Sequence, residues 1–240
     1  MSRMIAVAGA AVGLGIAVAA SLAGDALVEA RAPERAVSVK GLAERPVEAD
    51  VAVWRLPFRG DGPTADAAIA AATAARDAVR AFALGGGLTE ADLIEEPFAL
   101  RAERTIVEQG ASDRFRYFAV GALRIRSSDV ATVEALSGRT LELLTSGVAL
   151  GENDYAEAPR PIYAFTGLNA IKPDMITEAT QAARDAAQRF AADSGARLGP
   201  ILRANQGVVQ ILPRDEGFPE PYERRKLVRI VASVDYQLRD

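Results

Sequence analysis

The feature that most constrains the fold is an alanine-rich helical pattern that occurs twice in the chain. Residues Thr177–Gly195 read TEATQAARDAAQRFAADSG, and Ala70–Gly87 read AAATAARDAVRAFALGGG. Both stretches contain Ala-Ala-Arg-Asp-Ala, three variable positions, Phe-Ala, and a glycine four residues beyond that alanine. Such a match at one fixed offset predicts an internal duplication with one helix in each half.

Apolar residues recur at spacings of three and four in both copies, as expected for a helix with one buried face. The predicted stripes are Ile176, Ala179, Ala183, Ala186 and Phe190 in one copy, and Ala68, Ala71, Ala75, Ala78 and Phe82 in the other. Pro173 suits a helix start and Gly195 a helix end. Because alanine has little bulk, Phe82 and Phe190 are predicted to anchor the helices on a sheet. On this interpretation Phe190→Ala should destabilise the protein by roughly 3–5 kcal/mol.

Each copy also carries the same charged pair, Arg76-Asp77 and Arg184-Asp185. One hypothesis is that each pair ties its helix to an adjacent strand or a neighbouring subunit. The alternative is that these are exposed helix charges, each contributing well under about 1 kcal/mol.

Composition excludes several classes of site. The 240-residue chain has a net charge of -4, and its pI of about 5.2 argues against a nucleic-acid partner. It contains neither histidine nor cysteine, which excludes the common zinc sites, cysteine nucleophiles and Ser-His-Asp triads. We therefore predict no catalytic residue, no cofactor-binding residue and no metal site.

The N-terminal region predicts export. Residues Met4–Gly24 carry no charge and follow Arg3. A helix of this length spans about 31 Å, enough to cross a hydrocarbon core of about 30 Å. A cleaved signal peptide ending near Ala23 is the alternative, but the length of the segment favours an uncleaved signal anchor. The basic residue before it and Asp25 after it predict a cytoplasmic N-terminus and a periplasmic C-terminal domain on a single-pass inner-membrane protein.

The rest of the chain alternates strand and helix patterns. The strands predicted from alternating residues are 37–40, 47–58, 96–107, 115–126, 201–212 and 227–238. A turn is expected at 41–45, a bulge near Arg55, and a loop at Arg59–Pro63. The class is therefore α+β, with strand-strand-helix-strand-strand units, mainly antiparallel sheets and helices on one face, after one transmembrane helix.

This pattern divides the chain into a membrane anchor or signal segment, a tether and one periplasmic domain. The predicted bounds are 1–24 for the anchor, 25–35 for the tether and 36–240 for the domain, whose two pseudo-repeats, about 36–127 and 148–240, are joined by a middle helix at 128–145.

Several motifs resemble one known family. Val37–Arg45, followed by Ala49–Trp54, resembles the opening of bacterial SIMPL-domain proteins, an exported domain of unknown function named after a kinase-interacting relative. Phe165–Asn169, Asn205–Gly207 and the last strand also fit. The resemblance covers about 36–240 and implies a periplasmic or envelope-associated protein, with ring-like oligomers in some members. It implies no catalytic residues.

A few acidic groups are candidate sites. Glu152-Asn153-Asp154 offers oxygen ligands for Ca²⁺, but it lacks the spaced acids of a dedicated loop, which favours a polar turn. Glu95-Glu96, or Glu103 with Glu108, could form the carboxylate pair of a glycosidase. Adjacent acids on a strand point to opposite faces, which disfavours the first pair. Gly85–Gly87 follows a helix and is predicted to end it.

The sequence thus predicts a non-catalytic, membrane-anchored periplasmic binding or assembly module. Its small-molecule ligand is unknown, and homo-oligomerisation stays open. Two alternatives remain: a carboxylate-based hydrolase of envelope glycans, and a scaffold that binds a signalling partner through an exposed apolar edge.

Overall fold

The computed structural model describes residues 35–105, 114–153, 157–215, 217 and 219–240. These residues fold into two mainly antiparallel sheets with few helices, which confirms the α+β class. The chain forms two compact units. Unit 1 contains described residues 35–41, 180–205 and 232–240, and unit 2 contains 42–179 and 206–231 within the described ranges.

The strands and helices follow one another in this order: β1 (Ala36–Glu48), β2 (Val51–Gly62), α2 (Ala65–Gly85), η1 (Glu90–Asp92), β3 (Leu93–Glu95), β4 (Ala99–Thr105), β5 (Arg114–Ser127), α3 (Val130–Ser137), α4 (Thr140–Thr145), β6 (Ala149–Leu150), β7 (Ile162–Ala164), α5 (Leu168–Asp193), β8 (Arg197–Gln206), β9 (Gln210–Pro213), η2 (Glu220–Tyr222) and β10 (Arg225–Arg239).

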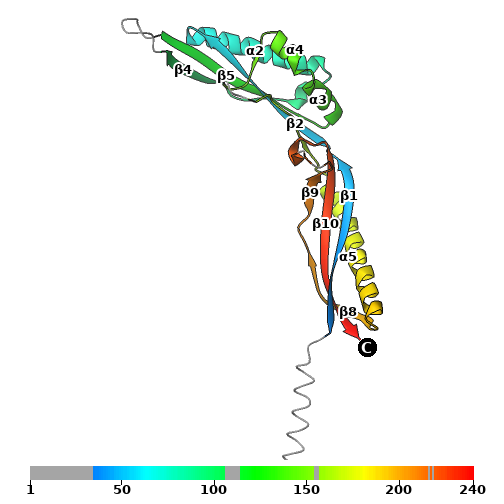
Figure 1. Ribbon diagram of the computed structural model, residues 1–240. Coiled ribbons are helices and arrows are strands. Elements are labelled where there is room, and N and C mark those ends of the chain that lie inside the picture. The colour runs from blue at the N-terminus through cyan, green and yellow to red at the C-terminus, as the bar shows by residue number, and fades with distance from the viewer. Residues whose placement is uncertain (1–34, 106–113, 154–156, 216, 218) are drawn as a thin grey trace, which may run out of the picture. The chain divides into compact units, whose positions relative to one another are not determined.

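Unit 2 is built on the sheet β3-β5-β2-β6, to which β4 adds through β5 and β7 through β2. Helices α2, α3 and α4 lie over one face of it (Figure 1). Alternate residues of β2 and β5 point to that face, as the period of a strand requires. The core between sheet and helices includes the fully buried side chains Trp54, Leu56, Phe58, Val79, Leu123, Ile125, Val133 and Leu136.

Helix α2 packs unusually close to β2 because Gly60 has no side chain. A Cβ atom built on Gly60 would lie 2.1 Å from the backbone nitrogen of Ala72 and 2.5 Å from the carbonyl oxygen of Ala68. The facing alanines Ala68 and Ala72 are fully buried. A row of small residues thus lets the helix backbone rest directly on the strand.

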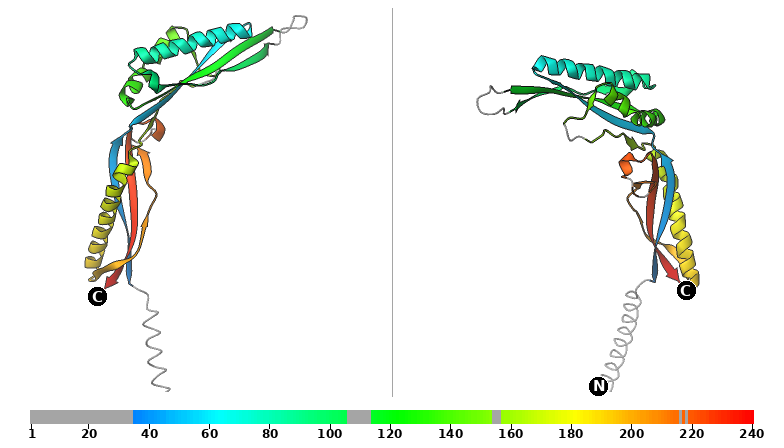
Figure 2. Two further views of the ribbon diagram at one scale, coloured as in Figure 1. Left: turned by 180° about the vertical axis from the view of Figure 1, so that it is seen from behind. Right: turned by 45° about the horizontal axis from the view of Figure 1, so that its top comes forward.

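The second sheet has the order β1-β10-β8, and β9 also pairs with β10. Figure 2 shows α5 running beside β1 and β10. In unit 1, Ala183 and Ala187 of α5 pack against Val39 of β1 and against Val234 and Tyr236 of β10. The sequence pattern thus correctly placed an alanine-lined helix on this sheet.

The prediction that Phe190 anchors α5 is wrong. Its side chain is 60% exposed, whereas the next residue, Ala191, is buried. Phe82 is partly buried against the core of unit 2, where the guanidinium of Arg139 lies 5.8 Å from its ring centroid. The buried row of α5 repeats at every fourth residue instead of at mixed spacings of three and four: Met175, Ala179, Ala183, Ala187 and Ala191.

Each sheet takes strands from both predicted pseudo-repeats. Strand β1, in the predicted half 36–127, lies in the sheet with β10 of the half 148–240, while β6 and β7 of the second half pair with β2 of the first. The two sets of strands therefore do not fold as separate sheets. The duplication itself concerns the origin of the sequence and stays a prediction.

Several local expectations also change. The helix expected to start at Pro173 begins at Leu168, so Pro173 lies inside α5. The strand predicted at 201–212 is divided between β8 and β9.

Strand β1 continues through the turn predicted at 41–45, and the chain turns at 49–50 instead. No bulge forms near Arg55, because β2 pairs with β5 in unbroken register. The sequence suggests a shift in apolar phase there because Val51 and Val53 are half-buried on the face opposite Trp54. In the loop predicted at Arg59–Pro63, residues 59–62 pair with β5 and therefore belong to β2. The middle helix predicted at 128–145 is two helices, α3 and α4.

The predicted membrane segment, Met4–Gly24, lies outside the described residues. Within the described part of the chain, no helix is both long enough and apolar enough to cross a bilayer.

Candidate functional site

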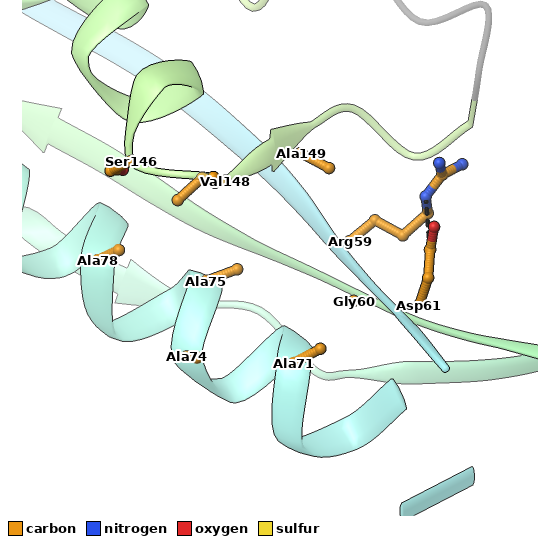
Figure 3. A pocket seen from close by; sticks show the side chains of 11 residues that line it. Arg59, Gly60, Asp61, Ala71, Ala74, Ala75, Ala78, Ser146, Val148 and Ala149 are labelled. Atoms are coloured by element: carbon orange, nitrogen blue, oxygen red, sulfur yellow. Dashed lines mark ion pairs between the residues drawn. The ribbon is translucent and has the colours of Figure 1, made fainter. Parts of the chain in front are cut away.

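A groove of about 420 Å³ with a partly apolar lining runs along α2 in unit 2. Figure 3 shows alanines of α2 facing Val148 and Ala149, with Arg59 and Asp61 at one end. Among its α2 residues, Ala71 and Ala74 are exposed. The close approach of α2 to Gly60 and the short side chains leave this space open beside the strand.

The groove runs along an edge of β2 that is only partly paired. Strand β6 pairs with Phe58 and Arg59, and β7 pairs with residues 51–53. Beyond Arg59, β5 continues to pair with the opposite edge of β2 as far as Gly62. No other strand in the described ranges pairs with the groove-side edge there. This geometry suits an extended peptide, whose backbone can add to a strand edge where small side chains allow close approach.

A charged cluster lies at the end of the groove. Asp61 contacts Arg59 at 3.0 Å and accepts a hydrogen bond from Arg116 at 2.8 Å. Both guanidiniums also lie over the ring of Phe118, at 5.4 and 5.2 Å from its centroid. The contact of Asp61 with Arg59 has ion-pair distance without hydrogen-bond geometry, so we treat it as electrostatic. The cluster presents two cations and one anion beside the strand edge.

The face of the sheet opposite the helices carries a second charged cluster. Arg55 donates to Glu96 at 2.8 Å and contacts Glu152 at 2.7 Å. Because both carboxylates contact one guanidinium, their contacting oxygens lie within about 8 Å of each other. The hydrogen bond with Glu96, strengthened by that with Glu152, raises the pKa of Arg55 above its ordinary value. The arginine therefore stays charged between the two acids.

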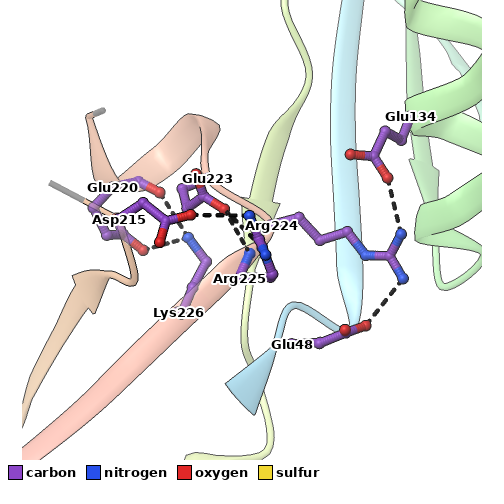
Figure 4. A network of polar contacts seen from close by, with 8 residues as sticks. All are labelled: Glu48, Glu134, Asp215, Glu220, Glu223, Arg224, Arg225 and Lys226. Carbon is purple, nitrogen blue, oxygen red and sulfur yellow. Dashed lines mark hydrogen bonds and ion pairs between the residues drawn. The ribbon is translucent and has the colours of Figure 1, made fainter. Parts of the chain in front are cut away.

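A third cluster, in Figure 4, joins three segments of unit 2. Arg224 donates to Glu134 of α3 at 2.8 Å and to Glu48 of β1 at 3.0 Å. The hydrogen bond with Glu134 is the main reason that the pKa of Arg224 is raised. These residues line a polar hollow of about 420 Å³. Because both terminal nitrogens of Arg224 are engaged, the cluster is suited to holding the segments together.

Lys226 is fully buried beside this cluster. Its ammonium group donates to the carboxylate of Glu220 at 2.6 Å and to the carbonyl oxygen of the same residue at 2.8 Å. A buried charge requires such partners to compensate for lost hydration. These contacts fix η2 against β10.

The acidic candidate residues do not come together in one site. Glu95 pairs with Arg80 of α2 and Glu96 with Arg55, so the two lie on opposite faces, as predicted. Glu103 is exposed on β4, while its proposed partner Glu108 lies outside the described residues.

The Ca²⁺ candidate, residues 152–154, does not form a described site either. Glu152 contacts Arg55, and Asp154 is outside the described residues. The described residues contain no group of three acids placed to hold a metal ion. The neighbouring pair Glu96 and Glu152 was not predicted, because only the tertiary fold brings the two acids to one arginine.

The repeated Arg-Asp pairs do not reach a neighbouring strand through their aspartates. Arg76 donates to the adjacent Asp77 at 2.8 Å, and Asp185 accepts from Gln181 of the same helix. Arg184 lines a shallow hollow beside β8. Within unit 1 and unit 2 these contacts favour exposed helix charges over the proposed tie to a strand. Contact with another subunit stays untested.

Comparison with known proteins identifies the family. Residues 37–236 match the profile of SIMPL, a protein of unknown function (DUF541). The chain belongs to the SIMPL family. This confirms the resemblance seen in the sequence motifs. No curated protein matches the chain.

Solved structures add little to the SIMPL assignment. A crystal structure of an uncharacterized conserved protein from Listeria innocua is similar at 14% identity, with 84% of this chain and 94% of that chain covered and a TM-score of 0.17. A likeness at this TM-score carries no argument about fold or function.

Proposed function

We propose that this SIMPL protein is a non-catalytic, single-pass inner-membrane protein whose C-terminal domain binds extended peptide segments of partner proteins in the periplasm. The groove beside β2 carries the binding part of the proposal, since it combines a strand edge that no described strand covers beyond Arg59 with a lining of small side chains. The uncharged segment Met4–Gly24 supports the location.

Peptide binding is tested by filling the groove from its solvent side. Ala74 is exposed on α2 and lines the groove, so Ala74→Phe should block it without disturbing the core. Ala81 is exposed on the same helix but does not line the groove, so Ala81→Phe is the matched control. Peptides selected by phage display on the full chain should lose binding to Ala74→Phe and retain it on Ala81→Phe. Equal binding to both variants would place the peptide elsewhere and refute the proposal.

The location is tested separately. Alkaline phosphatase folds into an active enzyme only after export, so a fusion after Asp240 should be active, while a cytoplasmic reporter at the same position should be inactive. The opposite pattern would remove the periplasmic part of the proposal and leave the groove to be judged on peptide binding alone.

Glu96 and Glu152 favour one alternative, a carboxylate-based hydrolase of envelope glycans. Their separation of at most about 8 Å falls in the range of glycosidase carboxylate pairs. Arg55 between them argues against it, because one acid of such a pair must carry a proton to protonate the leaving group. Release of reducing sugars from envelope glycan that is lost in both Glu96→Gln and Glu152→Gln would support the hydrolase and overturn our proposal.

A further inference from the structure

An exposed phenylalanine marks one end of unit 1. Phe190 lies in the last turn of α5, and its side chain is 60% exposed while the adjacent Ala191 is buried. After the helix, the amide of Ala196 donates to the carbonyl of Ala191 and leads the chain into β8. A single exposed apolar residue needs no special explanation. Phe190, however, lies among several exposed arginines.

Arginines surround this end of the unit. The start of β1, the end of β10, the end of α5 and the start of β8 come together there (Figure 1). The amide of Leu238 donates to the carbonyl of Arg35 at 2.7 Å, and this hydrogen bond joins the start of β1 to the end of β10. Four exposed arginines lie on these segments: Arg35, Arg189, Arg197 and Arg239.

Most of this positive charge is not neutralised within the described residues. Arg35 pairs with Asp240, and Arg239 donates to the neutral Gln237. No ion pair to a described residue involves Arg189 or Arg197. Asp193 in the last turn of α5 and Asp240 are the acidic side chains of the same segments, so the four arginines exceed them by two. In a protein whose net charge is -4, this end therefore combines a local excess of positive side chains with an exposed aromatic ring.

The chain enters unit 1 at the same end. The predicted membrane segment stops at Gly24, and ten residues, 25–34, lie between it and Arg35. Ten extended residues reach at most about 35 Å. If the segment spans the bilayer, as the proposed function requires, this end of unit 1 is held within that distance of the lipid surface.

We propose that this end of unit 1 rests on anionic lipid, with the Phe190 ring at headgroup level and Arg189, Arg197 and Arg239 against lipid phosphates. Interfacial protein segments combine basic and large apolar residues in this way, and each arginine near an anionic surface adds attraction. This inference rests on the proposed membrane anchor. Contact would orient unit 1 at the membrane.

The test uses the absence of cysteine from the full chain. Phe190→Cys and Ala204→Cys are labelled with the fluorophore NBD and reconstituted, as full-length protein, into vesicles of phosphatidylcholine with phosphatidylglycerol. Ala204 is an exposed residue of unit 1 near the other end of β8, which makes it the matched control. Nitroxide-labelled lipids should quench NBD at 190 and leave it bright at 204.

Charge variants test the lipid specificity. Arg189→Gln and Arg197→Gln should each lower the ratio of lipid-contacting to free label about fivefold, and vesicles of phosphatidylcholine alone should weaken quenching further. Far-UV circular dichroism reports whether each variant is folded.

Four outcomes would overturn the inference. Equal quenching at 190 and 204 would mean that there is no oriented contact. A blue-shifted label at 190 that nitroxide lipids do not quench would mean that the acidic tether 25–34 or a second copy covers it. If the full-length protein does not float with vesicles, the proposed membrane anchor is refuted, and this inference is refuted with it. Flotation without quenching at 190 would refute the lipid contact alone.

Discussion

Replacing Gly60 by alanine is the sharpest test of the packing that forms the groove. The added Cβ would lie 2.1 Å from the nitrogen of Ala72 and 2.5 Å from the carbonyl oxygen of Ala68, whereas ordinary contacts begin at 3.4 Å. Both clashes are with backbone, so no side-chain rotation relieves them. Helix α2 would have to move by more than about 1 Å, separating alanines that are fully buried.

Overpacking a core typically destabilises a protein by about 1–3 kcal/mol. With close contacts to rigid backbone, we expect Gly60→Ala to lower the free energy of unfolding by at least about 3 kcal/mol. For a domain of this size, that corresponds to a fall in melting temperature of roughly 6–12 °C.

Urea unfolding followed by fluorescence measures the effect in the right place, because the buried Trp54 lies in the core of unit 2. Gly85 is the matched control: a Cβ there has no neighbour within 4 Å, and the residue lies in the last turn of α2. Gly85→Ala should leave stability unchanged or raise it by up to about 1 kcal/mol. A Gly60→Ala protein as stable as the wild type, within about 1 kcal/mol, would refute the close packing of helix and strand.

Three further predictions concern other parts of the fold. Phe190→Ala should change stability by no more than about 0.5 kcal/mol, because the ring is mostly exposed, whereas Met175→Ala should destabilise by about 2–5 kcal/mol; urea unfolding of both variants decides this. Lys226→Met should be tolerated better than Glu220→Ala, which leaves a buried ammonium without its carboxylate, as melting temperatures would reveal; the reverse order would contradict the role given to the pair. The hydrogen bond from the Thr89 side chain is the main cause of the lowered pKa of Asp92. This carboxylate therefore stabilises the fold above the usual carboxyl pKa, and the stability difference from Asp92→Asn should vanish as pH falls through the lowered value. A difference that persists in acid would contradict this.

Local pattern was enough to predict the class of fold. The alternation of the last strand and the helical period around Arg184 depend only on the geometry of one element, so they could be identified without knowing its neighbours. The family followed from turn and strand motifs of the same local kind. The absence of histidine and cysteine likewise limits the available chemistry whatever the fold.

What the tertiary structure decided is which residues meet. Phe190 and Ala191 both fit an apolar stripe in sequence, and only the direction from which the sheet approaches α5 buries one and exposes the other. Glu96 and Glu152 are distant in the chain, yet they share Arg55 because β2 lies between the segments that carry them. Strand pairing also determines the groove, since the pairing of β6 with β2 stops at Arg59. Such contacts depend on the relative placement of whole elements, which the period of any one element does not encode.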